Sequence, residues 1–96
     1  MKAYLVLDFS VTDLAGFMPY VRRIPEHIAR HGGRYIVQGA APTTMEGDWT
    51  PARMVILEFP SRENAQGFLS DPTIQDLFKV RHTTTVSKLV LVDGCT

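Results

Sequence analysis

The stretch RHGGRYIVQG, residues 30–39, contains the change from helical to strand spacing on which the fold depends. Before it, apolar residues recur every three or four positions over residues 14–28, as they do on one face of a helix. After it, residues 34–38 have the composition of a strand. Gly32 is expected to take the left-handed conformation that ends a helix, and Gly33 to let the chain turn tightly into the strand.

Three other segments have the composition of strands. They are Ala3–Phe9 (AYLVLDF), Arg53–Phe59 (RMVILEF) and Val86–Val92 (VSKLVLV). Helical spacing fills the chain between the first and second strands and between the third and fourth, which gives the order β-α-β-β-α-β. This is the ferredoxin-like pattern of the α+β class. Right-handed crossovers predict an antiparallel sheet of order 4-1-3-2 with both helices on one face, and the 96 residues are expected to form a single domain.

The first helix has a clear beginning and two interruptions. Thr12 or Asp13 is expected to cap it, and its apolar stripe extends to about His31. Pro19 is expected to open a second helical segment, where its missing N–H costs nothing, and Pro25 to kink or divide the helix.

The second helical region contains two start signals. Ser61 is expected to cap a short helix. The pair Asp71-Pro72 is expected to start another helix, with Asp71 as the cap. The apolar stripe of that last helix continues as far as Arg81.

The composition excludes several classes of protein. Ten basic and ten acidic residues cancel, so no net charge attracts nucleic acid or an anionic membrane. No apolar run approaches the roughly 20 residues that span a bilayer, and the first apolar run is too short for a signal peptide. Cys95 is the only cysteine, which excludes an intrachain disulfide and a cysteine metal cluster. We therefore predict a cytoplasmic protein without nucleic-acid or membrane partners.

The two faces of the sheet differ in composition, because side chains alternate along a strand. The set assigned to the helices is wholly apolar or aromatic: Leu5, Leu7, Phe9, Tyr35, Val37, Val55, Leu57, Phe59, Leu89 and Leu91. The second set is Tyr4, Val6, Asp8, Arg34, Ile36, Gln38, Met54, Ile56, Glu58, Lys88, Val90 and Val92. Most of this second set is also apolar or aromatic, whereas a face open to water normally carries polar residues. We therefore expect a homodimer, two-fold symmetric, that covers this face.

Charged residues also fall on the second face. A register with Ile36 opposite Ile56 places Arg34 opposite Glu58, which predicts a cross-strand ion pair. The pair is either structural, or Arg34 and Glu58 belong to a site that holds an anionic ligand.

The histidines of the first helix permit two interpretations. His27 and His31 are four residues apart, a spacing that can hold a metal, but no third ligand lies nearby in the sequence, and we expect no metal. His31 continues the apolar stripe three residues after Ile28, so it either lines a pocket or complements the helix dipole at the C-terminal end.

The loop Gly39–Ala52 is long for a hairpin, where 2–5 residues are usual. Its Trp49 is expected either to fill the core or the dimer interface, or to wall a ligand pocket. The sequence contains no GxSxG motif and no glycine-rich phosphate loop.

Several segments together resemble a bacterial family. HGGRYIVQG, EGDW, RMVILEFPS, an arginine at Arg81 and LVDG make the chain similar to the family called domain of unknown function 1330. The resemblance implies the dimeric α/β-barrel superfamily, in which two ferredoxin-like sheets face each other. That superfamily includes cofactor-free monooxygenases of antibiotic biosynthesis, haem-degrading enzymes and isomerases of small acids. The resemblance implies no catalytic residue.

Three hypotheses of function follow. The first is a cofactor-free monooxygenase- or isomerase-like enzyme, whose pocket between helices and sheet contains Tyr20, His31, Trp49, Arg81 and His82. His31 is then the candidate acid–base catalyst, because histidine titrates near neutral pH. The second is a non-catalytic homodimeric module that binds a small acid or aromatic compound through Arg34 or Arg81. The third is haem binding through His31 or His82. The first two hypotheses need no cofactor, and we expect none.

Overall fold

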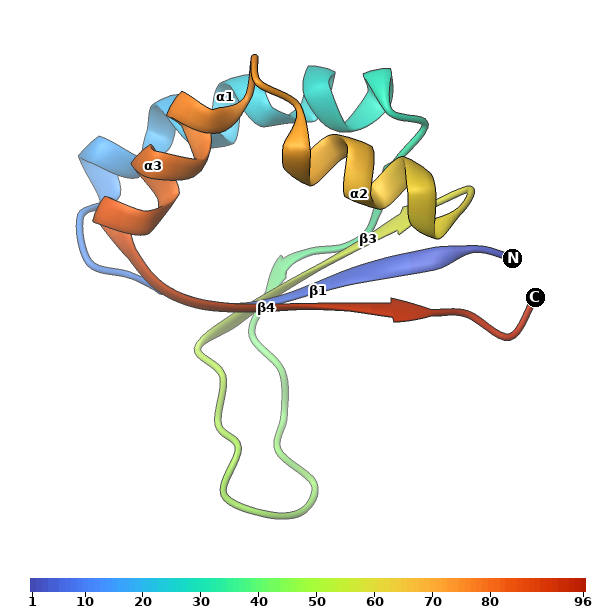
Figure 1. Cartoon of the computed structure of the whole chain (residues 1–96). Helices are drawn as coiled ribbons and strands as arrows, with labels where there is room; N and C mark the ends of the chain where they lie inside the picture. The colour runs from blue at the N-terminus through green and yellow to red at the C-terminus, as the bar shows by residue number, and fades with distance from the viewer.

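The structure is a computed structural model that describes all 96 residues. Its elements are β1 (Ala3–Val11), α1 (Leu14–Arg30), β2 (Arg34–Ala40), β3 (Arg53–Phe59), α2 (Arg62–Ser70), α3 (Gln75–Thr84) and β4 (Thr85–Asp93). The four strands form one antiparallel sheet of order β2-β3-β1-β4, which is the predicted order counted from the other edge. All three helices lie on one face of this sheet (Figure 1). The ferredoxin-like fold predicted from the sequence is confirmed.

The ends of α1 follow the capping rules. The side chain of Asp13 accepts a hydrogen bond of 3.0 Å from the backbone N–H of Gly16. At the other end Gly32 has a φ of 78°, and the N–H groups of Gly32 and Gly33 donate to the carbonyls of Ala29 and Ile28, both at 2.9 Å. This is the Schellman arrangement, in which a left-handed residue satisfies the last carbonyls of a helix. The predicted helix stop is confirmed.

The two prolines do not divide α1, which runs unbroken from Leu14 to Arg30. This corrects the expectation that Pro19 opens a new segment and that Pro25 divides the helix. Both prolines are exposed, so the carbonyls that lose a donor face water. The opposite side of α1 is buried against the sheet, and this burial holds the helix together through both positions.

The Asp71-Pro72 signal is a turn rather than a helix start. The prediction that Ser61 caps α2 is confirmed, since its hydroxyl accepts from the N–H of Asn64. Asp71 instead accepts hydrogen bonds from the N–H and the hydroxyl of Thr73, at 2.9 and 2.7 Å. This local turn occupies the carboxylate, and α3 begins three residues after Pro72, at Gln75.

One apolar core fills the space between helices and sheet. Its residues are Leu5, Leu7, Phe9, Phe17, Tyr20, Ile24, Ile28, Leu57, Phe59, Ala65, Phe68, Ile74, Leu77 and Phe78. The opposite face of the sheet, which we call the outer face, has no covering layer, and the loop of residues 41–52 extends away on that side (Figure 1). None of the helices combines the length and the apolar character that crossing a membrane would require.

The register of β2 contains an irregularity that the sequence pattern did not predict. Arg34 pairs with Glu58 as expected, but the residue opposite Ile56 is Val37 rather than Ile36, and Gln38 pairs with Val55. A bulge of this kind places two residues opposite one and reverses the alternation beyond it. Val37 therefore lies on the outer face and Gln38 on the helix-facing side of the sheet, which corrects the assignment of both residues.

Candidate ligand-binding cavity

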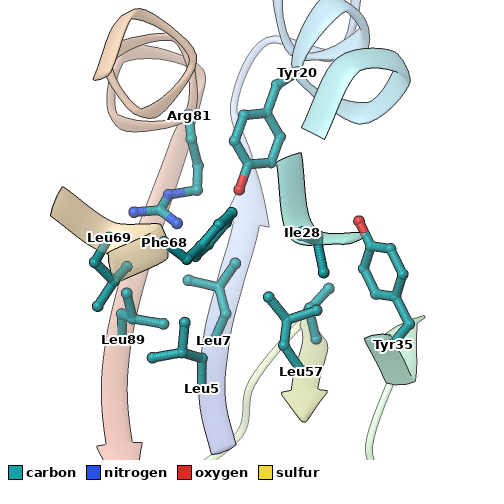
Figure 2. A pocket seen from close by; sticks show the side chains of 11 residues that line it. Leu5, Leu7, Tyr20, Ile28, Tyr35, Leu57, Phe68, Leu69, Arg81 and Leu89 are labelled. Atoms are coloured by element: carbon teal, nitrogen blue, oxygen red, sulfur yellow. The ribbon is translucent and has the colours of Figure 1, made fainter. Parts of the chain in front are cut away.

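A small chamber lies between the helices and the sheet (Figure 2). Its volume is about 40 Å³. Eleven residues line it: Leu5, Leu7, Tyr20, Ile28, Tyr35, Val55, Leu57, Phe68, Leu69, Arg81 and Leu89. Apart from two phenol hydroxyls and one guanidinium, the lining is apolar. Only these three side chains can make hydrogen bonds to a ligand in the chamber.

Arg81 is the only charged group of the chamber. It comes from α3, its side chain extends toward Phe68 and Leu89, and the residue is 7% exposed (Figure 2). Its Nε is buried and makes no hydrogen bond, and Nη2 lies 3.2 Å from Nε2 of His82. Its Cζ lies 5.3 Å from the ring centroid of Phe78.

None of the ion pairs in the structure includes Arg81. A guanidinium stays charged at physiological pH, and arginine is almost never this buried without an anionic partner. Arg81 therefore carries a positive charge inside the protein that no carboxylate neutralises, with the faces of two aromatic rings beside it.

Two tyrosines complete the polar lining of the chamber. Tyr20 projects from α1 and Tyr35 rises from β2 beside Ile28 (Figure 2). Burial raises the pKa of Tyr20, and the nearby charge of Arg81 opposes that rise. Burial, reinforced by the proximity of Tyr20, raises the pKa of Tyr35 to about 12. Both phenols are therefore protonated at neutral pH and can donate hydrogen bonds to an acceptor.

A more open cleft adjoins the chamber. Its volume is about 250 Å³, and it lies between α1 and the ends of β2 and β3. Its lining residues are Phe9, Val11, Leu14, Phe17, Met18, Tyr20, Val21, Ile24, Tyr35, Gln38, Gly39, Arg53 and Val55. Tyr20, Tyr35 and Val55 belong to both sets, so the chamber and the cleft share one wall.

The structure brings only Tyr20 and Arg81 together out of the five residues predicted to share a pocket. His82 is exposed and touches the chamber only through Arg81. Trp49 lies on the other side of the sheet, where its indole N–H donates to Asp8 at 2.7 Å. The expected five-residue pocket is therefore corrected to the pair of Tyr20 and Arg81, joined by Tyr35.

His31 lies outside both cavities. It is the C-cap of α1, and its Nε2 is 2.7 Å from Oδ2 of Asp71, with its ring against the edge of Phe68. Hydrogen bonds from His31 and from Thr73 hold the pKa of Asp71 well below its usual range. This pair ties the end of α1 to the turn before α3, so the structure places His31 in a helix-end contact rather than in a pocket.

The Arg34–Glu58 pair predicted from the register is present on the outer face. Nε of Arg34 lies 3.0 Å from Oε1 of Glu58, and the hydroxyl of Tyr4 donates to Oε2 at 3.1 Å. The hydrogen bond from Arg34 is the main reason why the pKa of Glu58 is lowered. No cavity opens beside this cluster, and its residues sit among the exposed apolar side chains of the same face.

No group of three or more histidine, cysteine, aspartate or glutamate side chains is arranged to hold a metal ion. His27, considered above as half of a metal pair with His31, is buried, and its Nδ1 lies 3.3 Å from Nη1 of Arg30.

Sequence reasoning missed Gln38 and Tyr35 as residues of the site. Tyr35 was assigned to the helix-facing side but not to a pocket. The signal for Gln38 was the glycine that follows it, because a glycine inside a strand often marks a bulge. Gly39 has a φ of 86°, a conformation that other residues rarely adopt.

The comparisons with known proteins agree with this architecture. Residues 2–95 match the family described as domain of unknown function, DUF1330. The chain belongs to that family. The family resemblance noted in the sequence is thereby confirmed. No curated protein matches the sequence.

Solved structures with the same fold include proteins of several kinds. A protein of unknown function from Rhodopseudomonas palustris is 18% identical with a TM-score of 0.80, over 99% of this chain and 83% of the other. SnoaB, a cofactor-independent oxygenase from Streptomyces nogalater, is 18% identical with a TM-score of 0.70, over 99% and 94% of the two chains. A dimeric protein of unknown function with a ferredoxin-like fold from Bacteroides fragilis is 13% identical with a TM-score of 0.55, over 97% and 96%. At these identities the likeness establishes the shared fold.

Proposed function

We propose that this DUF1330 protein binds a small organic anion whose charged group lies in the chamber between its helices and its sheet. The observation that carries the proposal is the buried guanidinium of Arg81, which has no acidic partner in the chain. An anion in the chamber would supply that partner, and the protonated hydroxyl of Tyr20 would add a hydrogen-bond donor. Because the remaining lining is apolar, the charge pair would form away from water, where electrostatic attraction is strong.

The proposal is tested by thermal unfolding in the presence of matched pairs of compounds. Benzoate and hexanoate are compared with benzyl alcohol and hexanol, which have similar apolar parts and no charge. The acids are expected to raise the melting temperature, since a ligand at about 100 times its Kd stabilises the folded state by about 2.7 kcal/mol. Arg81→Met is expected to abolish the rise, whereas Lys79→Met, an exposed change on the same helix, leaves it intact. Equal stabilisation by acids and alcohols would contradict the proposal.

Turnover of the bound anion is a second candidate. It is supported by the shared fold with SnoaB, a cofactor-independent oxygenase. No carboxylate or imidazole lines the chamber, so the substrate would have to arrive as an anion, and the charge of Arg81 would stabilise it. The test is oxygen uptake with 1,8-dihydroxynaphthalene. An uptake above that of buffer, lost in Arg81→Met, would favour turnover over binding alone.

We further propose that the protein acts as a homodimer through the outer face of its sheet. Val90 and Val92 on that face are 59% and 48% exposed, and Ile36, in β2 at the opposite edge of the sheet, is 44% exposed. An apolar surface of this kind on a sheet is normally covered. The Bacteroides fragilis protein with this fold is dimeric, which supports a homodimer here. Sedimentation as a monomer at micromolar concentration would contradict it. The cytoplasmic location predicted from the sequence stays a prediction.

A further inference from the structure

The chamber is too small to hold a whole organic molecule. A bound water occupies at least about 10–15 Å³ on this measure of volume, so 40 Å³ has room for only a few non-hydrogen atoms. Ligand pockets in proteins usually enclose about 300–1,000 Å³. A carboxylate or a similar head group therefore fits beside Arg81, and the rest of its molecule must lie elsewhere.

The cleft is the one cavity that shares a wall with the chamber. The other three cavities lie along the loop and on the outer side of β1 and β4, and none of them contains a residue of the chamber. The side chains of Tyr20, Tyr35 and Val55 line both the chamber and the cleft. Joining the two volumes requires one of the two phenols to change its side-chain rotamer.

The lining of the cleft indicates the chemistry of what it holds. Most of its lining is apolar, with Met18, Val21 and Ile24 contributed by α1. Besides the hydroxyls of Tyr20 and Tyr35, which it shares with the chamber, its polar side chains are Gln38 and Arg53, and Nη1 of Arg53 donates to the carbonyl of Gly39, the residue after Gln38, at 3.0 Å. Gln38 reaches this position only because the bulge in β2 turns it toward the helices. Bulges often occur beside functional sites, where they redirect a side chain.

We infer that the chamber and the cleft form one elongated site for an amphipathic acid. The acidic head group pairs with Arg81 in the chamber, the apolar body lies in the cleft, and the far end reaches Gln38 and Arg53. The inference rests on the proposed function for the position of the head group. It adds the length of the ligand, its apolar body and a hydrogen-bonding group at the far end.

The experiment measures the dissociation constants of butyrate, hexanoate, octanoate and 8-hydroxyoctanoate by NMR titration of the full-length protein. Each methylene buried in the cleft is expected to raise the affinity about three- to fourfold. Val21→Trp fills the cleft from the exposed side of α1, and it is expected to remove the gain with chain length while leaving butyrate unchanged. Ala29→Trp is the matched control, because Ala29 is exposed on the same helix and lines neither cavity. Gln38→Leu is expected to remove the preference for 8-hydroxyoctanoate over octanoate.

The outcomes separate this inference from the proposed function. Equal affinities for butyrate and octanoate, both lost in Arg81→Met, would overturn the elongated site and support anion binding. Affinity for 1-octanol equal to that for octanoate and unaffected by Arg81→Met would support the apolar body in the cleft and overturn anion binding. A wild-type protein that binds neither the acids nor 1-octanol would overturn both.

Discussion

Replacement of Arg81 by methionine is expected to stabilise the unliganded protein while it abolishes binding. Methionine retains the apolar stem of arginine, so the contacts with the rings of Tyr20 and Phe78 largely persist. The change removes a buried charge that has no acidic partner and an Nε that makes no hydrogen bond. Apolar replacement of buried charged groups stabilises proteins by about 1–4 kcal/mol in favourable cases.

Two losses reduce this gain. The attraction between the guanidinium and the two rings contributes about 0.5–2 kcal/mol, and the contact between Nη2 and His82 is weak at 3.2 Å. We therefore expect a net gain of about 1–2 kcal/mol, which corresponds to a rise in melting temperature of roughly 5–15 °C for a domain of this size.

Calorimetry and urea unfolding of the wild type and Arg81→Met, at one fixed protein concentration, measure this difference. The fixed concentration matters because subunit association shifts the melting temperature of a dimer. Lys79→Met, exposed on the same helix, is expected to stay within about 0.5 kcal/mol of the wild type. A loss of stability in Arg81→Met larger than about 1 kcal/mol would refute the reasoning, because it would mean that the rings and His82 compensate the charge without a ligand.

Three further predictions concern other parts of the molecule. Asp71→Asn is expected to destabilise the protein at about pH 6, and the difference in unfolding free energy from the wild type should narrow as the pH falls below about 4. The reason is that a carboxylate whose pKa is lowered in the folded state stabilises the protein above its unfolded pKa and loses this effect as it is protonated. Urea unfolding across that pH range measures the difference, and a constant difference down to about pH 2 would contradict the prediction. Val90→Asp is expected to convert the homodimer to a monomer by placing a charge on the outer face, and sedimentation that still shows a dimer would count against that interface. Gly33→Ala is expected to destabilise the protein by about 1–3 kcal/mol, because a Cβ there would lie 2.6 Å from Cε1 of Phe59. Gly67→Ala in α2 meets only ordinary contacts and should stabilise the protein by about 0.5–1 kcal/mol. Chemical denaturation that gives both variants the same stability would be inconsistent with this packing.

The strand and helix order could be predicted because each element has its own period and its own stop signal. Gly32 and Ser61 act through local geometry, so a short window of sequence is enough to recognise them. The bulge in β2 depends on pairing between strands, and a strict period of two assigned Gln38 to the wrong face.

The candidate site was predicted only in part. Arg81 was recognised as part of a helical stripe, and Tyr20 as a possible partner, because both lie on faces that must meet the sheet. His31 shares the same apolar stripe, but it lies at the end of the helix, where Asp71 is within reach. Which side chains converge depends on the ends and relative positions of helices, and these are set by packing rather than by local spacing.

The single tryptophan gives this protein a built-in optical reporter of one surface. Trp49 is 58% exposed, and its indole is held by Asp8 on the face of the sheet opposite to the chamber. Indole emission shifts to the blue when water is excluded from the ring. Fluorescence of Trp49 will therefore follow whatever covers the outer face, and the tyrosines of the chamber will have to be observed separately. A dilution series followed by Trp49 emission will then report dissociation of the dimer, and a ligand titration followed by the tyrosines will report binding in the chamber.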